Sequence, residues 1–157
     1  MEKLHKDLDP QQFQSLPQVI DYIVKEHGEL PAFSCFGKTL SYSEVDVLSS
    51  RFANYLQNET KLIAGDRIAI QLPNVLQFPI VLYGALKAGI VVVNTNPLYT
   101  ANEMLHQFKD SSVKAVVILS NFCDKLEKII DQTEIETIIV TELGDLQFPP
   151  KRFLINN

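Results

Sequence analysis

The sequence predicts an α/β fold: a partial, mostly parallel sheet flanked by helices, with a small β-hairpin near the N-terminus. Between residues 67 and 141, short β-branched segments alternate with amphipathic segments of helical spacing. That alternation is typical of strand–helix–strand units with right-handed crossovers. Residues 90–93 (IVVV) form a continuous apolar run, which is typical of a strand buried on both faces. Upstream, Gly37 separates two short strand-like segments, which indicates the hairpin.

The first predicted element is a helix that begins at Ser15. Ser15 can cap the helix, Pro17 can occupy its first turn, and Gln18 can reach back toward the cap. Gly28 is the predicted end. An apolar stripe lies between these signals and consists of Val19, Ile20, Ile23 and Val24.

The hairpin and the second helix follow within residues 32–60. Gly37 and Lys38 are the predicted two-residue turn, with glycine at the position that needs a positive φ. Ser41 and Glu44 have the spacing of a capping box, so a helix is expected from there. Its inward-facing residues at helical spacing are Val45, Leu48, Phe52, Ala53 and Leu56.

The next elements are a strand over residues 67–72 and a third helix. The strand follows a turn at Gly65-Asp66 and has apolar residues at 68, 70 and 72 on one face. Asn74 is a candidate cap for the helix, although Pro79 indicates either a later start or a bent first turn. Gly89 ends this helix. Its inward-facing residues are Val75, Phe78, Leu82, Ala85 and Leu86.

The remaining predicted elements are two helices and two strands. Thr100 and Glu103 form a third capping box, which starts a helix. Strands are predicted over residues 114–119 and 137–140, with a helix over 121–131 between them. The inward-facing residues of the two helices are Met104, Leu105, Phe108, Phe122, Leu126, Ile129 and Ile130.

The last ten residues differ from the preceding chain. Pro149-Pro150 is expected to break regular structure, and residues 153–155 begin an apolar pattern that is not completed. We therefore divide the chain into an α/β subdomain, residues 1–147, and a linker or start of a further element, residues 148–157. This pattern also predicts that the sequence is a truncated part of a longer protein.

Charge and hydropathy exclude several classes of protein. The 157 residues are 46% apolar and have a formal net charge of −5 without a run of like charges, which argues against nucleic-acid binding and a polybasic membrane anchor. Residues 1–10 have mixed charge and are not a signal peptide. Residues 75–93 are too interrupted to span a membrane. A cytoplasmic protein is therefore predicted, and peripheral membrane contact stays open.

The cysteines and histidines are scattered. Cys35 and Cys123 are interpreted as small buried apolar residues in a reducing compartment, with a disulfide as the open alternative. His5, His27 and His106 show no metal-ligand spacing with the cysteines. We expect His27 to favour the dipole at its helix end and His106 to be a solvated helix residue. No metal site is predicted.

No catalytic constellation is apparent either. Asp124 and Glu127 alternate with Lys125 and Lys128, which is typical of an exposed, ion-paired helix face. Residues 84–89 have the glycine spacing of a phosphate-binding loop but lack the following Lys-Ser/Thr and lie at a helix end. Neither a dinucleotide-binding G-x-G-x-x-G nor a G-x-S-x-G elbow occurs.

Residues 72–117, LPNVLQFPIVLYGALKAGIVVVNTNPLYTANEMLHQFKDSSVKAVV, closely resemble the N-terminal part of bacterial long-chain fatty acid–CoA ligases. These enzymes belong to the adenylate-forming acyl-CoA synthetase and luciferase superfamily. The resemblance extends from about Phe13 through nearly the whole chain. NTNPLYT after a helix that ends in AG is fairly specific to the fatty acyl branch, whereas the alternating sheet pattern is general.

The resemblance implies an AMP-forming ligase. Such enzymes join ATP and a fatty acid into an acyl-adenylate with release of pyrophosphate, and then transfer the acyl group to coenzyme A. They use ATP, Mg²⁺ and coenzyme A, and their phosphate loop, adenine and magnesium segment, ribose-binding Asp and catalytic Lys lie further along the chain. None of these motifs occurs in the 157 residues. We therefore expect no catalytic residue, no bound cofactor and no catalysis in this chain alone.

The segment NTNPLYT leaves the carboxyl end of a predicted parallel strand, where ligands gather in open α/β sheets. The resemblance implies that this loop lies near the entrance for the coenzyme A nucleotide. The candidates for lining it are Asn94, Asn96, Pro97, Leu98 and Tyr99. A purely structural role is the favoured alternative, since Thr100 and Glu103 cap the next helix and Pro97 fixes the turn. Both roles are compatible.

Two other functions stay open. The chain could be a stand-alone interaction module that lost its chemistry and kept its sheet. It could also be an unrelated flavodoxin-like binding domain, which no motif supports. In either case an incomplete sheet would expose apolar area, so self-association is expected.

Overall fold

The computed structural model describes residues 12–156, so the predictions for His5 and residues 1–10 lie outside the described residues. The helices are α1 Leu16–His27, α2 Tyr42–Glu59, α3 Gln77–Lys87, α4 Ala101–Asp110, α5 Cys123–Glu127 and α6 Lys151–Asn156. The strands are β1 Pro31–Cys35, β2 Lys38–Ser41, β3 Arg67–Gln71, β4 Val91–Asn94, β5 Ala115–Leu119 and β6 Thr137–Thr141. The predicted α/β class is confirmed.

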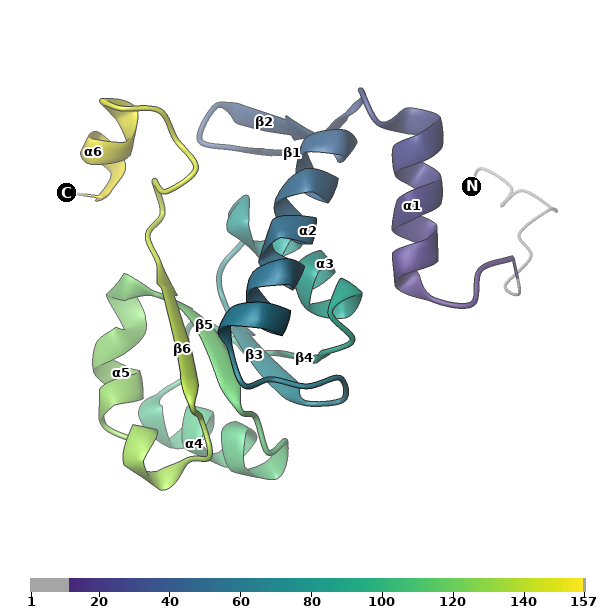
Figure 1. The fold of residues 1–157 in the computed structure, drawn as a ribbon. Helices are drawn as coiled ribbons and strands as arrows, with labels where there is room; N and C mark the ends of the chain where they lie inside the picture. Colours follow the sequence, from purple (N-terminus) through teal and green to yellow (C-terminus); the bar gives the residue numbers. More distant parts are fainter. Residues whose placement is uncertain (1–11, 157) are drawn as a thin grey trace, which may run out of the picture.

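Strands β3 to β6 form one parallel sheet in the order β4-β3-β5-β6, and β1 and β2 form a separate antiparallel hairpin (Figure 1). Helices α2 and α3 pack on one face of the sheet against Ile68, Ile70 and Val117. Helices α4 and α5 pack on the other face against Val116 and Ile118. Because β5 is covered on both faces and has a neighbour on each side, all five of its residues are buried.

Side-chain caps start three helices where the sequence predicts them. Ser15 accepts a hydrogen bond from the Gln18 amide, and the capping boxes that begin at Ser41 and Thr100 are both complete. Gln18 reaches back to the amide of Gln14 rather than to the cap residue itself. Each box satisfies two amides that the first helical turn leaves without partners, which fixes the start of the helix.

Two turn predictions need correction. The hairpin turn is Phe36-Gly37, one residue earlier than predicted, because Cys35 pairs with Lys38. Both turn residues have positive φ, 49° and 72°, as a two-residue turn of this hand requires. Asn74 does not cap the third helix, which begins at Gln77 without a side-chain cap. Pro79 therefore lies in the first turn, where its missing amide costs no helical hydrogen bond.

Two predictions about regular structure also need correction. Residues 90–93 were expected to be buried on both faces, yet β4 pairs only with β3 in the described chain and Val91 is 47% exposed. The helix predicted over 121–131 is broken into a 3₁₀ turn, the short α5 and a second 3₁₀ turn. The residues after Pro150 form the short helix α6, within the region 148–157 in which a linker or the start of a further element was predicted.

Helices α2 and α3 approach each other closely. A Cβ atom on Gly84 of α3 would lie 2.7 Å from the carbonyl oxygen of Ser49, so only glycine fits at this crossing. Lys87, at the end of α3, has a side chain that is only 14% exposed. Its Nζ donates to the carbonyl and carboxylate oxygens of Asp46 and to the hydroxyls of Ser49 and Ser50, at 2.9 and 3.0 Å for the hydroxyls. Lys87 therefore ties α3 to α2.

Asp66 fixes the turn that leads into β3. Its carboxylate accepts the amide of Ile63 at 2.9 Å and forms an ion pair with Lys114 at 2.8 Å. The hydrogen bond from the Ile63 amide lowers the pKa of the Asp66 carboxyl, and the bond from Lys114 lowers it further. The folded state therefore binds a proton less readily at this site than the unfolded chain does.

We predict that the free energy of unfolding falls as the pH decreases below about 5. Because the folded pKa of Asp66 is lowered, its contribution is present above the unfolded value of about 4 and is lost as the pH falls through the folded value. Urea denaturation as a function of pH measures this dependence. Asp66→Asn should make the dependence of the unfolding free energy on pH shallower. Asp124→Asn should not change it, because the Asp124 carboxylate lies 3.7 Å from the Lys128 ammonium group in an exposed ion pair. If the unfolding free energy depended on pH equally in both variants, Asp66 would not be the source of this dependence.

Candidate functional site

The parallel sheet places the carboxyl ends of its four strands at one edge. After β3 the chain turns to α3 on one face, whereas after β5 it turns to α5 on the opposite face. The strand order therefore reverses between β3 and β5, and such a reversal opens a crevice in which α/β proteins commonly bind ligands. The sequence alone did not reveal this position, because strand order cannot be read from alternation.

The predicted site residues lie on the neighbouring side of β3, at the last residue of β4 and in the turn that follows it. The amide of Thr95 donates to the carbonyl of Ile70 at 3.0 Å, so the segment continues alongside β3. Asn96 then closes a compact turn, with its side-chain oxygen accepting the Leu98 amide at 3.0 Å and its carbonyl accepting the Tyr99 amide at 3.1 Å. The backbone is thus ordered by its own hydrogen bonds.

The side chains of the five predicted residues do not surround one cavity. Asn94, Asn96 and Leu98 are exposed, Leu98 to 77%, while Pro97 and Tyr99 are half-buried. Only Tyr99 lines the adjacent shallow pocket of about 450 Å³. The other residues of that pocket come from α4 and are Asn102, Glu103, His106, Gln107 and Asp110. The segment therefore presents a surface ridge rather than an enclosed binding site.

A second pocket, which the sequence did not predict, lies between the hairpin and the β3–α3 connection. It has a volume of about 350 Å³ and is mostly apolar. The Cys35 thiol lies at its wall, 3.7 Å from the carbonyl oxygen of Asn74. The remaining lining residues are Phe33, Ser34, Val75, Leu76, Phe78 and Pro79. No sequence signal marks this pocket, because it forms only when the hairpin packs on the start of α3.

A third hollow, of about 390 Å³, lies on the α2–α3 face beside β6. It is lined mainly by apolar side chains, among them Phe52, Ile80 and Val140. Strand β6 pairs only with β5 in the described chain, and its Ile138 and Val140 are about half exposed. This part of the sheet is covered less completely than the centre.

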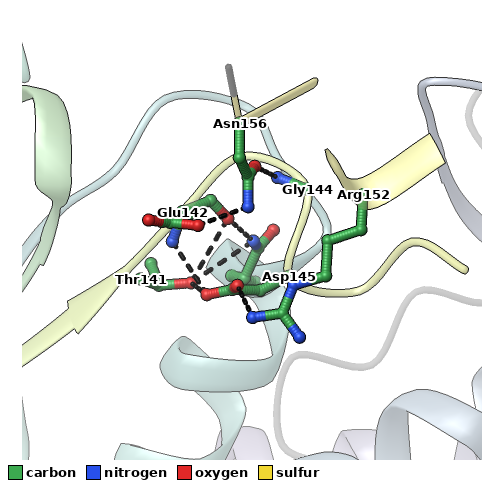
Figure 2. A network of polar contacts seen from close by, with 7 residues as sticks. Thr141, Glu142, Gly144, Asp145, Arg152 and Asn156 are labelled. Atoms are coloured by element: carbon green, nitrogen blue, oxygen red, sulfur yellow. Dashed lines mark hydrogen bonds and ion pairs between the residues drawn. The ribbon is translucent and has the colours of Figure 1, made fainter. Parts of the chain in front are cut away.

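The chain after β6 is held by a polar network (Figure 2). The carboxylate of Asp145 accepts the Thr141 hydroxyl and the Glu142 amide, both at 2.8 Å, and pairs with Arg152 of α6 at 2.8 Å. Asn156 accepts the Gly144 amide at 2.7 Å and donates to Glu142. The network therefore holds α6 against the chain that follows β6. The sequence indicated none of it, because these partners are separated by up to fourteen positions.

The two thiols are free and half-buried, which corrects the prediction that they are buried and excludes the disulfide alternative. Burial raises the pKa of the Cys123 thiol, so this group is less reactive than an exposed cysteine. Within residues 12–156, no group of three or more His, Cys, Asp or Glu side chains could hold a metal ion. None of the described helices has the length and apolar character that crossing a membrane requires.

The acidic and basic residues of α5 differ in part from the prediction. Asp124 and Lys128 form the expected exposed pair. Lys125 instead donates to the carbonyl oxygen of Tyr99 at 2.9 Å and lies 5.2 Å from the ring centre of Phe122. Lys125 therefore contacts the predicted site, which its position in a charged helix face did not suggest.

Two curated relatives cover almost the whole chain. The long-chain-fatty-acid–CoA ligase of Haemophilus influenzae is 43% identical over 151 residues, which is 96% of this chain and 27% of that protein. The enzyme of the same name from Escherichia coli O157:H7 is 41% identical over 150 residues, with the same coverage of both chains. The chain thus spans about a quarter of the length of these relatives.

Solved structures share the fold. A long-chain-fatty-acid–CoA ligase from Archaeoglobus fulgidus superposes with a TM-score of 0.76 at 21% identity, covering 81% of this chain and 27% of that one. A benzoate CoA ligase from Burkholderia xenovorans LB400 gives 0.76 at 19% identity, covering 83% and 26%. The family model for AMP-binding enzymes matches residues 20–152. The chain therefore belongs to the AMP-binding enzyme family.

Proposed function

We propose that this chain is the N-terminal part of an AMP-forming long-chain fatty acid–CoA ligase. The identity of 43% to the Haemophilus influenzae ligase over 96% of the chain is the observation on which this proposal rests. The complete enzyme uses ATP and Mg²⁺ to convert a fatty acid to its acyl-adenylate with release of pyrophosphate. It then transfers the acyl group to coenzyme A and releases AMP. The 157 residues alone do not catalyse either step.

The role proposed for Asn94, Asn96, Pro97, Leu98 and Tyr99 is to line the entrance for the coenzyme A nucleotide. Their position at the carboxyl edge of the sheet supports this role, since ligands of open α/β sheets bind at that edge. A backbone that is held in place while Leu98 stays 77% exposed also supports it. An ordered, exposed apolar side chain contacts a ligand without a large ordering cost.

The remaining proposals concern the whole protein. Residues 1–147 form its N-terminal α/β subdomain, and residues 148–157 begin the next element. The complete enzyme is cytoplasmic and contacts membranes peripherally, where fatty acids partition. The isolated chain self-associates through the exposed strands at the two edges of its sheet, an arrangement that unpaired β-edges favour.

A chimeric enzyme tests the proposed function. The region of the Haemophilus influenzae ligase that matches this chain is replaced by the corresponding residues of this chain. We expect the chimera to form fatty acyl-CoA, and we expect the 157-residue chain alone to show no ATP–pyrophosphate exchange. A folded chimera without ligase activity, or exchange by the isolated chain, would contradict the proposal.

Substituting Leu98 in the chimera tests the entrance. Leu98→Glu introduces a negative charge beside the coenzyme A phosphates and should raise the KM for coenzyme A about tenfold, which corresponds to about 1.4 kcal/mol. The rate of adenylate formation should not change. Ile63→Glu is the matched control, because Ile63 is similarly exposed and precedes β3 at the opposite edge of the sheet. Equal KM values in the two variants would exclude Leu98 from the entrance.

A further inference from the structure

We propose that Gln71, Gln107 and Lys125 are positioning residues that hold the entrance segment, residues 94–99, in one conformation. Each side chain donates a hydrogen bond to a different backbone carbonyl of the segment. Gln107 bonds Asn94 O at 3.1 Å, Gln71 bonds Asn96 O at 3.5 Å, and Lys125 bonds Tyr99 O at 2.9 Å. The functional part of this inference rests on the proposed coenzyme A entrance, whereas the anchoring rests on the geometry alone.

The three donors come from three different elements. Gln71 ends β3, Gln107 lies in α4, and Lys125 lies in α5. They reach the beginning, middle and end of the segment, so each of these three points is held by a separate element. Three tethers from independent elements fix a loop more completely than several bonds within the loop, because the surrounding packing already holds each donor.

Lys125 is the strongest of the three anchors. An ammonium donor makes a shorter and stronger hydrogen bond than a neutral amide does. Its side chain is half-buried and extends over the ring of Phe122, with 5.2 Å from Nζ to the ring centre. The ring and the carbonyl together restrict where the ammonium group can lie.

The orientation of the two glutamine amides supports the same role. In both side chains Nε2 faces a segment carbonyl, while the Oε1 atom is buried without a hydrogen-bond partner among the described residues. A buried acceptor without a donor is unfavourable. Turning either amide around would place its oxygen against a carbonyl oxygen, so the segment backbone determines the observed orientation.

Anchoring the backbone leaves the exposed side chains of Asn94, Asn96 and Leu98 in fixed positions. A segment that is already ordered loses less conformational entropy when a ligand binds, which favours binding without affecting chemistry elsewhere. Loss of an anchor should therefore weaken coenzyme A binding and leave adenylate formation unchanged.

The first experiment measures the anchoring in the 157-residue chain. The sequence contains no tryptophan, so Leu98→Trp introduces a single tryptophan at an exposed position of the segment, and this residue can be excited selectively over the five tyrosines. In this background Lys125→Met should increase the fraction of anisotropy lost by nanosecond motion about twofold. Lys128→Met is the matched control, because Lys128 directly follows α5 and its exposed side chain forms an ion pair with the exposed Asp124. Equal anisotropy decays in the two variants would overturn the anchoring.

The anisotropy test requires variants that remain folded. Circular dichroism establishes that each variant has the secondary structure of the parent chain. If Lys125→Met does not fold, Gln107→Leu removes a different anchor and should have the same effect on the anisotropy. Lys125→Arg retains a charged donor and should restore most of the rigidity, which a general loss of packing would not produce.

The second experiment measures the consequence in the chimeric ligase. Lys125→Met should raise the KM for coenzyme A about fivefold, with adenylate formation unchanged, and Lys128→Met should have neither effect. An inactive parent chimera would overturn the proposed function, while the anisotropy experiment would still decide the anchoring. An active chimera in which Lys125→Met leaves the KM for coenzyme A unchanged would overturn the positioning role and leave the proposed function intact.

Discussion

Phe108→Ala is expected to lower the free energy of unfolding by about 3–5 kcal/mol. The Phe108 side chain extends from α4 into the cluster between α4, α5 and the sheet and is 1% exposed. Removing the ring loses its transfer free energy and leaves a cavity next to Met104 and Val116, both of which are fully buried. The surrounding backbone belongs to regular elements and can relax only in part, so the cavity persists.

Urea denaturation followed by circular dichroism measures this effect. The midpoint should decrease at an unchanged denaturant slope, as expected when the native contacts change and the exposed area on unfolding does not. Leu98→Ala is the control, because Leu98 is 77% exposed and its truncation should change stability by less than about 0.5 kcal/mol. A Phe108→Ala midpoint close to that of the control would show that α4 does not pack on the sheet as described.

Lys87→Met is expected to lower the free energy of unfolding by about 2–3 kcal/mol. Methionine keeps most of the side-chain volume, so the change removes the ammonium group and little packing. The carboxylate of Asp46 then loses its charged partner, and the hydroxyl of Ser50 loses a donor. Because the Asp46 side chain is 31% exposed, water replaces part of the lost interaction, and the cost stays below that of a fully buried pair.

Lys61→Met provides the matched control for Lys87→Met. Lys61 pairs with Glu136 at 3.8 Å, and its side chain is 90% exposed, so removal of its charge should cost less than about 0.5 kcal/mol. A double-mutant cycle of Lys87→Met with Asp46→Asn isolates the interaction between the two side chains. A cycle in which the two substitutions are additive would mean that the Lys87–Asp46 side-chain pair contributes nothing to stability.

Sequence signals predicted a helix end or a turn well where residues close in sequence determine it. The capping boxes at Ser41 and Thr100, the positive φ of Gly37 and the end of α3 before Gly89 depend on residues close in sequence, and all appear as expected. The predictions that depend on neighbours were less reliable. The run IVVV indicated a strand correctly, but its exposure depends on sheet order, which placed β4 at an edge.

The candidate site shows the same division. The sequence indicated the segment after β4, because a strand end followed by a capping box is a local pattern. The sequence did not indicate the residues that anchor this segment. Lys125, for example, lies 26 positions from Tyr99, and its sequence pattern is typical of a solvated, charged helix face. Similarly, the pocket beside Cys35 forms from segments about 40 positions apart. Periodicity cannot reveal such contacts, because it contains no information about which elements are neighbours.

The order of strands along one side of the sheet has a mechanical consequence. From β3 outward, the strands β5 and β6 are added in the order in which the chain encounters them. Tension applied at the C-terminal end would act first on α6 and its contacts with Glu142, Gly144 and Asp145. It would then act on β6, which five ladder positions join to β5. The load would break the hydrogen bonds between β6 and β5 one position after another, and it would reach β5 only after β6 had detached. Resistance to pulling from that end is thus set by α6, its polar contacts and the outermost strand, and not by the most deeply buried strand.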